Sequence, residues 1–200
     1  MKQLILASQS PRRNELLSQL GYQFITQSAD IDESVKYNEN AQDYVVRLAR
    51  EKAQKVFSAL SVKQQSQSVV LGSDTSVVID GDILGKPANE AECIAILMRL
   101  ESKQHQVLTA IAAIESNRTV YELVETQVQF KALTIDEIKR YWQTGEPCDK
   151  AGSYGIQGIG GQFVTTINGS YSSVVGLPLY ETAQLLAKVG LPSSIKENSA

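Results

Sequence analysis

Hydrophobic residues recur along this chain with two different periods, which together predict alternating strands and helices. Short apolar runs are typical of buried strands, and apolar residues three and four positions apart are typical of helices. This pattern predicts helices over residues 11–20, 40–60, 89–100, 134–142 and 178–188. It predicts strands over residues 4–7, 69–71, 76–79, 83–84, 106–115, 119–131 and 162–167.

Capping and turn residues support several of these elements. Asn40 is a preferred residue at a helix start, and Asp80-Gly81 is typical of a tight hairpin turn. The polar segments 28–39 and 63–68 are expected to be exposed connections. Because helices alternate with strands and a hairpin also occurs, the sequence predicts an α/β fold with a mixed sheet flanked by helices.

The length of 200 residues fits one domain, or one domain with two lobes that share a continuous core. We expect this domain to cover residues 1–191 and residues 192–200 to form a frayed tail. The N-terminal apolar run is too short for a signal peptide or a membrane span, so we expect a soluble, cytoplasmic protein without a membrane partner.

The chain carries a net charge of -3, which argues against stable binding to nucleic acid. A phosphate ligand would therefore need a local cluster of Lys and Arg. His105 is the only histidine, which excludes a His-rich metal site, and its polar surroundings predict a surface or loop position. Cys93 and Cys148 match no metal or redox spacing and are expected to be reduced thiols.

Ser8-Gln9-Ser10-Pro11-Arg12-Arg13 joins the first strand to the first helix. Ser10 followed by Pro11 suffices to start a helix without any ligand. However, arginines in a first turn oppose the helix dipole. A bound anion would reverse this effect, because free backbone N–H groups and Arg side chains together bind phosphate.

Two acidic positions are candidates for chemistry. Asp32 and Glu33 lie in an acidic loop, which is either simply solvated or provides ligands for a hard cation. Asp74 is expected at the end of a buried strand, where a carboxylate needs a partner or a metal. It could bind a divalent cation, deprotonate a water molecule or do both; capping a turn is the alternative.

Two lysines and a glycine-rich segment complete the candidates. Lys86, which follows the predicted hairpin, and Lys52, on the long helix, could contact phosphate or could be solvated. Segment 149–158 is dense in glycine, which permits close approach of a ligand to the backbone, although a flexible loop is the alternative. Gln157 could recognise the edge of a base through its amide donor and acceptor.

Together these segments closely resemble the Maf family of nucleoside triphosphate pyrophosphatases. The matching stretches are SQSPRR at 8–13, DES at 32–34, GSDT at 72–75, GKP at 85–87 and KAGSYGIQG at 150–158. The resemblance implies an elongated mixed sheet with two lobes around a cleft. It implies that Asp74 is the catalytic base, and that the phosphate and metal contacts are Ser8, Arg13, Glu33, Lys52 and Lys86.

Arg12, Thr75 and Gln157 resemble the branch of the family that acts on dTTP, UTP and modified uridine triphosphates. The resemblance implies release of a monophosphate and pyrophosphate, with a divalent cation (Mg, Mn or Co) held by Glu33 and Asp74. It further implies a homodimer, removal of surplus or non-standard nucleotides and a link to arrest of cell division. Ser73 stands where the family often has Ala.

Two alternatives to this function remain. One is a pyrophosphatase for 7-methyl-GTP or another non-standard purine triphosphate. The other is a non-catalytic nucleotide binder that regulates septum formation. The presence of both Asp74 and Glu33 argues against a pure binder, because bare carboxylates do not help a protein to hold a polyphosphate.

Overall fold

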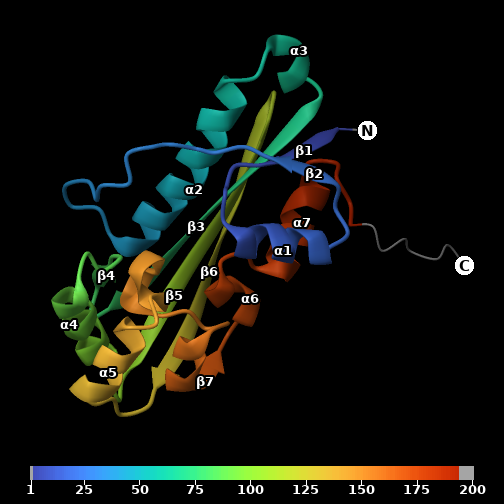
Figure 1. Cartoon of the computed structure of the whole chain (residues 1–200). Helices are drawn as coiled ribbons and strands as arrows, with labels where there is room; N and C mark the ends of the chain where they lie inside the picture. The colour runs from blue at the N-terminus through green and yellow to red at the C-terminus, as the bar shows by residue number, and fades with distance from the viewer. Residues whose placement is uncertain (1, 194–200) are drawn as a thin grey trace, which may run out of the picture. The chain divides into compact units, whose positions relative to one another are not determined.

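The computed structural model describes residues 2–193, which form a seven-stranded mixed sheet with helices packed on it (Figure 1). The strand order is β2-β1-β3-β5-β6-β7, and β4 pairs with β3 outside this path. The predicted α/β class is therefore confirmed. Most of the tail predicted at 192–200 lies outside the described residues. Within residues 2–193, no helix is both long and apolar enough to cross a membrane.

The chain divides into two compact units. Unit 1 comprises Met1–Asp74, Thr109–Leu123 and Gly176–Ala200, and unit 2 comprises Thr75–Leu108 and Val124–Val175. Strands β3 (Ser68–Ile79), β5 (Gln104–Glu115) and β6 (Arg118–Phe130) each contribute residues to both units. The boundary in β3 falls between Asp74 and Thr75. The cleft implied by the resemblance stays a prediction.

Unit 1 is built on parallel strands. Its first strand, β1 (Gln3–Leu6), pairs in parallel with β2 (Phe24–Thr26) and with the first half of β3. Its helices are α1 (Pro11–Gln19), α2 (Ala41–Ser58), α3 (Val62–Gln65) and α7 (Leu179–Lys188). Asn40 caps α2 as predicted, since its side chain accepts a hydrogen bond of 2.8 Å from Asp43 N. The apolar face of α2 packs in a core with Ile5, Val70 and Ile114.

Unit 2 contains antiparallel pairs. β4 (Asp82–Leu84) pairs with the second half of β3, and β7 (Val164–Asn168) pairs with β6. Asp80 and Gly81 both have positive φ, of 54° and 84°, as the predicted hairpin turn requires. Its helices are α4 (Glu90–Leu100), α5 (Ile135–Trp142) and α6 (Tyr171–Val175), with 3₁₀ helices η1 (Glu146–Asp149), η2 (Ala151–Ser153) and η3 (Ile159–Phe163).

Two predictions about elements are wrong. The stretch 63–68 is not simply an exposed connection, because Ser61 and Gln64 form a reciprocal capping box that starts α3. The two strands predicted at 69–71 and 76–79 are one continuous strand, β3. Asp74 therefore lies within a strand, not at the end of one, and its carboxylate accepts a hydrogen bond from the buried Lys52 there.

The prediction for His105 is also wrong. It lies on β5 with 2% of its surface exposed, on the same strand face as Val107. Its Nε2 lies 2.9 Å from the Tyr154 hydroxyl, and its ring packs edge-on against Phe130. Burial lowers the pKa of His105 to about 4, so the imidazole is neutral at physiological pH. Cys93 and Cys148 are free thiols, as predicted.

Candidate active site

Asp74 lies at the centre of the candidate site, on the part of β3 that crosses helix α2. A Cβ atom at Gly72 would lie only 2.2 Å from the Ala49 carbonyl oxygen, so glycine is required for this close helix–strand contact. The contact places Lys52, which lies one turn after Ala49, beside the strand. Lys52 Nζ donates a hydrogen bond of 2.7 Å to Asp74 Oδ1.

Glu33 reaches the same ammonium group from the acidic loop, with Oε1 at 2.7 Å from Lys52 Nζ. Lys52 is buried, with 9% of its surface exposed, and Asp74 is buried as well. One ammonium group thus pairs with two carboxylates that come from distant parts of the chain. This arrangement agrees with the grouping of Glu33, Lys52 and Asp74 in the resemblance.

Helix α2 also holds the acidic loop through two residues that the sequence analysis does not single out. The Tyr44 hydroxyl donates 2.8 Å to Glu33 O, and Arg47 Nη2 donates 3.0 Å to Ser34 O. Arg47 also binds both carboxylate oxygens of Glu39, at 2.5 and 2.8 Å. The spacing of Tyr44 and Arg47 on one helix face is visible in the sequence, but their partners in the loop are not.

The electrostatics around Asp74 suit a general base. Burial raises the pKa of Asp74 above its ordinary value, whereas the positive charges of Lys52 and Arg13 act in the opposite direction. A carboxylate with a raised pKa accepts a proton more readily than an exposed one. The carboxylate therefore combines a raised basicity with nearby cations that keep its ionised form accessible.

The donor set of Glu33 and Asp74 fits a divalent cation shared with a phosphate ligand. Mg²⁺ is typically bound by one or two carboxylates, with phosphate oxygens and water completing its shell. Among residues 2–193, no group of three or more His, Cys, Asp or Glu side chains is placed to hold a metal.

Arg13 and Ser8 lie beside this cluster. Arg13 Nε donates 3.0 Å to Gly176 O, and Arg13 Nη1 lies 3.4 Å from Ser8 Oγ. Ser10 occupies the N-cap position as predicted, but its side chain makes no capping bond; its N–H donates to Ser8 Oγ instead. Ser73 also donates to Gly176 O, at 3.0 Å, which gives its hydroxyl a structural role.

Burial lowers the pKa of Arg13 from its ordinary value, and the negative charge of Asp74 opposes this effect. Unit 1 thus brings together five of the predicted residues: Ser8, Arg13, Glu33, Lys52 and Asp74. Arg12, half-buried in the first turn of α1, belongs to the same unit.

The remaining predicted residues belong to unit 2. Thr75 is half-buried on β3, Lys86 is exposed after β4, and Gln157 is exposed in the glycine-rich segment. Gly152 N donates 3.1 Å to Gly85 O, so the backbone next to Lys86 is joined to this segment. The grouping of these three residues with Asp74 stays a prediction.

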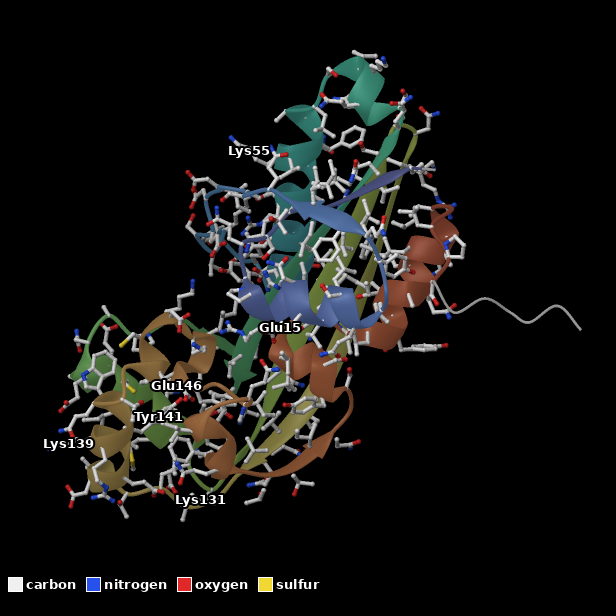
Figure 2. The ribbon with its side chains drawn as sticks, turned by 45° about the vertical axis from the view of Figure 1, so that its right-hand side comes forward. Glu15, Lys55, Lys131, Lys139, Tyr141 and Glu146 are labelled. Atoms are coloured by element: carbon white, nitrogen blue, oxygen red, sulfur yellow. The ribbon has the colours of Figure 1, made fainter. Side chains whose placement is uncertain are left out.

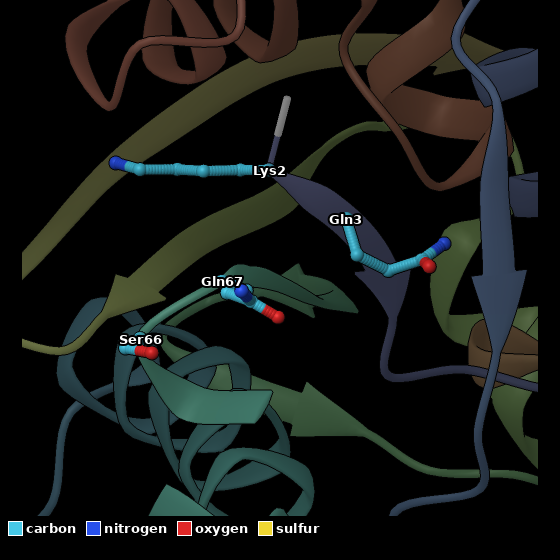
Figure 3. Close-up of a pocket in the computed structure, with 4 residues that line it drawn as sticks. All are labelled: Lys2, Gln3, Ser66 and Gln67. Carbon is cyan, nitrogen blue, oxygen red and sulfur yellow. The ribbon is translucent and has the colours of Figure 1, made fainter. Parts of the chain in front are cut away.

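Tyr141 and Glu146, which belong to none of the sequence motifs, tie the glycine-rich segment together (Figure 2). No local sequence signal marks them, because their partners are backbone N–H groups elsewhere in the fold. A separate hollow in unit 1 is lined by Lys2, Gln3, Ser66 and Gln67 (Figure 3). It contains none of the predicted site residues and is not a candidate for the active site.

Comparison with known proteins matches residues 3–189 to the family described as Maf-like protein. A dTTP/UTP pyrophosphatase of Colwellia psychrerythraea is 63% identical, over 97% of this chain and 92% of the relative. The dTTP/UTP pyrophosphatase of Vibrio vulnificus strain YJ016 is 54% identical, over 93% of this chain and 98% of the relative. That of Pseudoalteromonas atlantica is 55% identical, over 94% of this chain and 97% of the relative.

Proposed function

This chain belongs to the Maf family, and from that premise we propose that it hydrolyses dTTP and UTP to the monophosphate and pyrophosphate. The observation that carries the proposal is the convergence of Glu33 and Asp74 on Lys52 Nζ, at 2.7 Å each. The cluster places a buried carboxylate among cationic side chains, which is what attack of water on a polyphosphate requires. The relatives named above support the choice of substrate, and modified uridine triphosphates belong to the same class.

In the proposed mechanism, Asp74 accepts a proton from the attacking water. The water oxygen forms a bond to the α-phosphorus, the bond from that phosphorus to the bridging oxygen breaks, and pyrophosphate leaves. Arg13, Lys52 and Lys86 neutralise the negative charge that develops on the leaving group. Ser8 positions Arg13. Glu33 and Asp74 would hold a divalent cation such as Mg, Mn or Co, which supplies further positive charge to the phosphates.

Arg12, Thr75 and Gln157 are the proposed contacts to the pyrimidine. The side-chain amide of Gln157 offers one acceptor and two donors, which can pair with the N3–H and O4 edge shared by uracil and thymine. The amino group of cytosine at the corresponding position would present a different pattern. The resemblance also supports a cytoplasmic homodimer that removes surplus or non-standard nucleotides, with a link to cell-division arrest.

An assay of products with the Asp74→Asn variant tests this function. We expect the wild-type protein with Mg²⁺ to release pyrophosphate from dTTP and UTP in preference to CTP, GTP, 7-methyl-GTP and ITP. In Asp74→Asn, kcat should fall by about 10²–10⁴-fold, because the general base is lost. Nucleotide binding should persist. Asp82→Asn is the matched control, since Asp82 is an exposed surface carboxylate paired with Arg99.

Three results would contradict parts of the proposal. Pyrophosphate from purine triphosphates alone would keep the reaction but overturn the pyrimidine contacts. Orthophosphate as the product would overturn the site of attack. Tight nucleotide binding without any product would favour a non-catalytic binder.

A further inference from the structure

Gln157 lies in a short turn whose geometry is fixed by backbone hydrogen bonds. Gly158 N donates 3.2 Å to Gly155 O, so Ile156 and Gln157 occupy the two central positions of the turn. The Gln157 side chain is exposed. Any interaction that fixes the two ends of this turn therefore also fixes the backbone position from which the Gln157 side chain extends.

One pair of side chains holds both ends of the turn. On the near side, Gly155 N donates 3.3 Å to the Tyr141 hydroxyl. On the far side, Ile159 N and Gly160 N donate to the Glu146 carboxylate, at 2.7 and 2.9 Å. The Tyr141 hydroxyl in turn donates 2.8 Å to Glu146 Oε1, and the two side chains lie together in Figure 2. The Tyr141–Glu146 pair thus links the two ends of the turn, in addition to the turn's own backbone hydrogen bond.

The glycines of this segment make room for the Tyr141–Glu146 pair. A Cβ atom at Gly158 would lie 2.3 Å from Glu146 Oε2, and a Cβ atom at Gly160 would lie 2.6 Å from the Tyr141 hydroxyl. From the sequence, the glycine density indicates close approach of a ligand or a flexible loop. At these two positions the structure gives a different reason, because the protein's own side chains occupy that space.

The Glu146 carboxylate is charged in this environment. Its burial disfavours the charged form, but hydrogen bonds from Gly160 N, Tyr141 and Ile159 N outweigh that effect and lower the pKa of Glu146. Burial and the bond to Glu146 raise the pKa of Tyr141, which keeps its proton available for donation. Both groups therefore stay in the protonation states that hold the turn at neutral pH.

We propose that Glu146 and Tyr141 are positioning residues for base recognition, and that they hold the Gln157 turn so that its amide meets the N3–H and O4 edge of uracil or thymine. This inference rests on the proposed function. The expected gain in binding affinity comes from preorganisation, because a turn already held in its binding conformation loses less entropy when the nucleotide binds. Neither residue takes part in proton transfer or phosphate binding in the proposed mechanism.

The test compares Glu146→Gln and Tyr141→Phe with the wild type and with Glu137→Gln. Glu137 is a carboxylate on α5 that pairs with Lys131, and it serves as the matched control. Calorimetry would measure binding of the non-hydrolysable α,β-imido analogues of UTP and CTP. We expect Glu146→Gln to reduce the preference for the UTP analogue by about tenfold, as loss of a charge-assisted hydrogen bond would. Tyr141→Phe should reduce it less, and Glu137→Gln should not change it.

Kinetics and hydrogen exchange separate positioning from a general loss of structure. In Glu146→Gln, KM for UTP should rise about tenfold with kcat nearly unchanged, and the amides of residues 155–160 should exchange faster than in the wild type. Faster exchange without a change in base preference would overturn the proposal, as would no change in either. If the wild type releases no pyrophosphate, the proposed function fails, whereas the binding preference still tests the role of Glu146.

Discussion

At the scale of single residues, Lys52 determines the state of the candidate site. Its ammonium group is buried between Asp74 and Glu33, at 2.7 Å from each carboxylate. A buried carboxylate that loses its hydrogen-bonded cation is strongly disfavoured in its charged form. Lys52 therefore has two proposed effects: it contacts phosphate, and its positive charge favours the ionised form of the proposed general base.

Replacing Lys52 with Gln should shift the pH dependence of the reaction. The pKa of Asp74 is already raised by burial and is held down by Lys52, so removing the lysine raises it further. Because a general base acts in its deprotonated form, the acid limb of the kcat/KM profile should move to higher pH. Activity near neutral pH should fall. A profile measured from pH 4 to 9 would show this shift.

Lys55→Gln is the control for that experiment, since Lys55 is an exposed lysine on the same helix (Figure 2). Its profile should match that of the wild type. If the acid limb stays in place in Lys52→Gln, Asp74 is not the group whose ionisation limits the reaction.

Sequence motifs identify the residues of the phosphate cluster but not the residues that hold them. Asp74 and Glu33 lie in segments that match the family's motifs, whereas Lys52 is assigned to the same site only by the family resemblance. Glu146 and Tyr141 lie outside those motifs. They accept hydrogen bonds from backbone N–H groups that only folding brings close to them. Such partners cannot be read from residue types and spacing.

At the scale of elements, the contact between α2 and β3 creates the site. Lys52 reaches β3 because Gly72 allows the helix backbone to approach the strand closely. The hydrophobic period of α2 and its Asn40 cap are strong local signals, so this helix is predicted well. The continuity of β3 is not predicted from the sequence. Asp74 resembles an interruption of the strand until its tertiary partners are known.

Gly72→Ala should destabilise the protein. The new methyl carbon would lie 2.2 Å from Ala49 O and 2.9 Å from Ala53 N, both backbone atoms, so the helix must shift. We expect a loss of about 1–3 kcal/mol or more in the free energy of unfolding, measured by urea denaturation. Activity should also fall, because the shift moves Lys52 away from Asp74.

The matched control is Gly85→Ala, since a Cβ atom at Gly85 would have no heavy atom within 4 Å. Its free energy of unfolding should change by less than about 0.5 kcal/mol. Equal stability of the Gly72→Ala variant and the wild type would show that α2 and β3 do not pack as described.

At the scale of the whole molecule, the two units are interleaved along the chain. Unit 1 uses three separate segments and unit 2 uses two, and β3, β5 and β6 pass from one unit into the other without a break. The sequence predicts one domain with two lobes but not this division, because it depends on which distant segments pack together. Each of these three strands therefore crosses the boundary as a continuous strand and not as a flexible linker.

We expect the two units to unfold together. Local melting of one unit would break strands that also belong to the other, which favours a single transition. Trp142, the only tryptophan, reports on unit 2 through its fluorescence. Hydrogen exchange of β1 amides reports on unit 1. The two probes should give the same free energy of unfolding, and a difference of several kcal/mol would show that the units unfold independently.

The turn around Gln157 also has a consequence for how base preference could change during evolution. Gly158, Gly160, Tyr141 and Glu146 constrain one another, so a mutation at any one of them requires compensation at another. Gln157 itself is exposed and free of that constraint. If Gln157 contacts the base as proposed, a lineage could therefore alter one of the three base contacts through a single codon at position 157 while it inherits the surrounding turn unchanged.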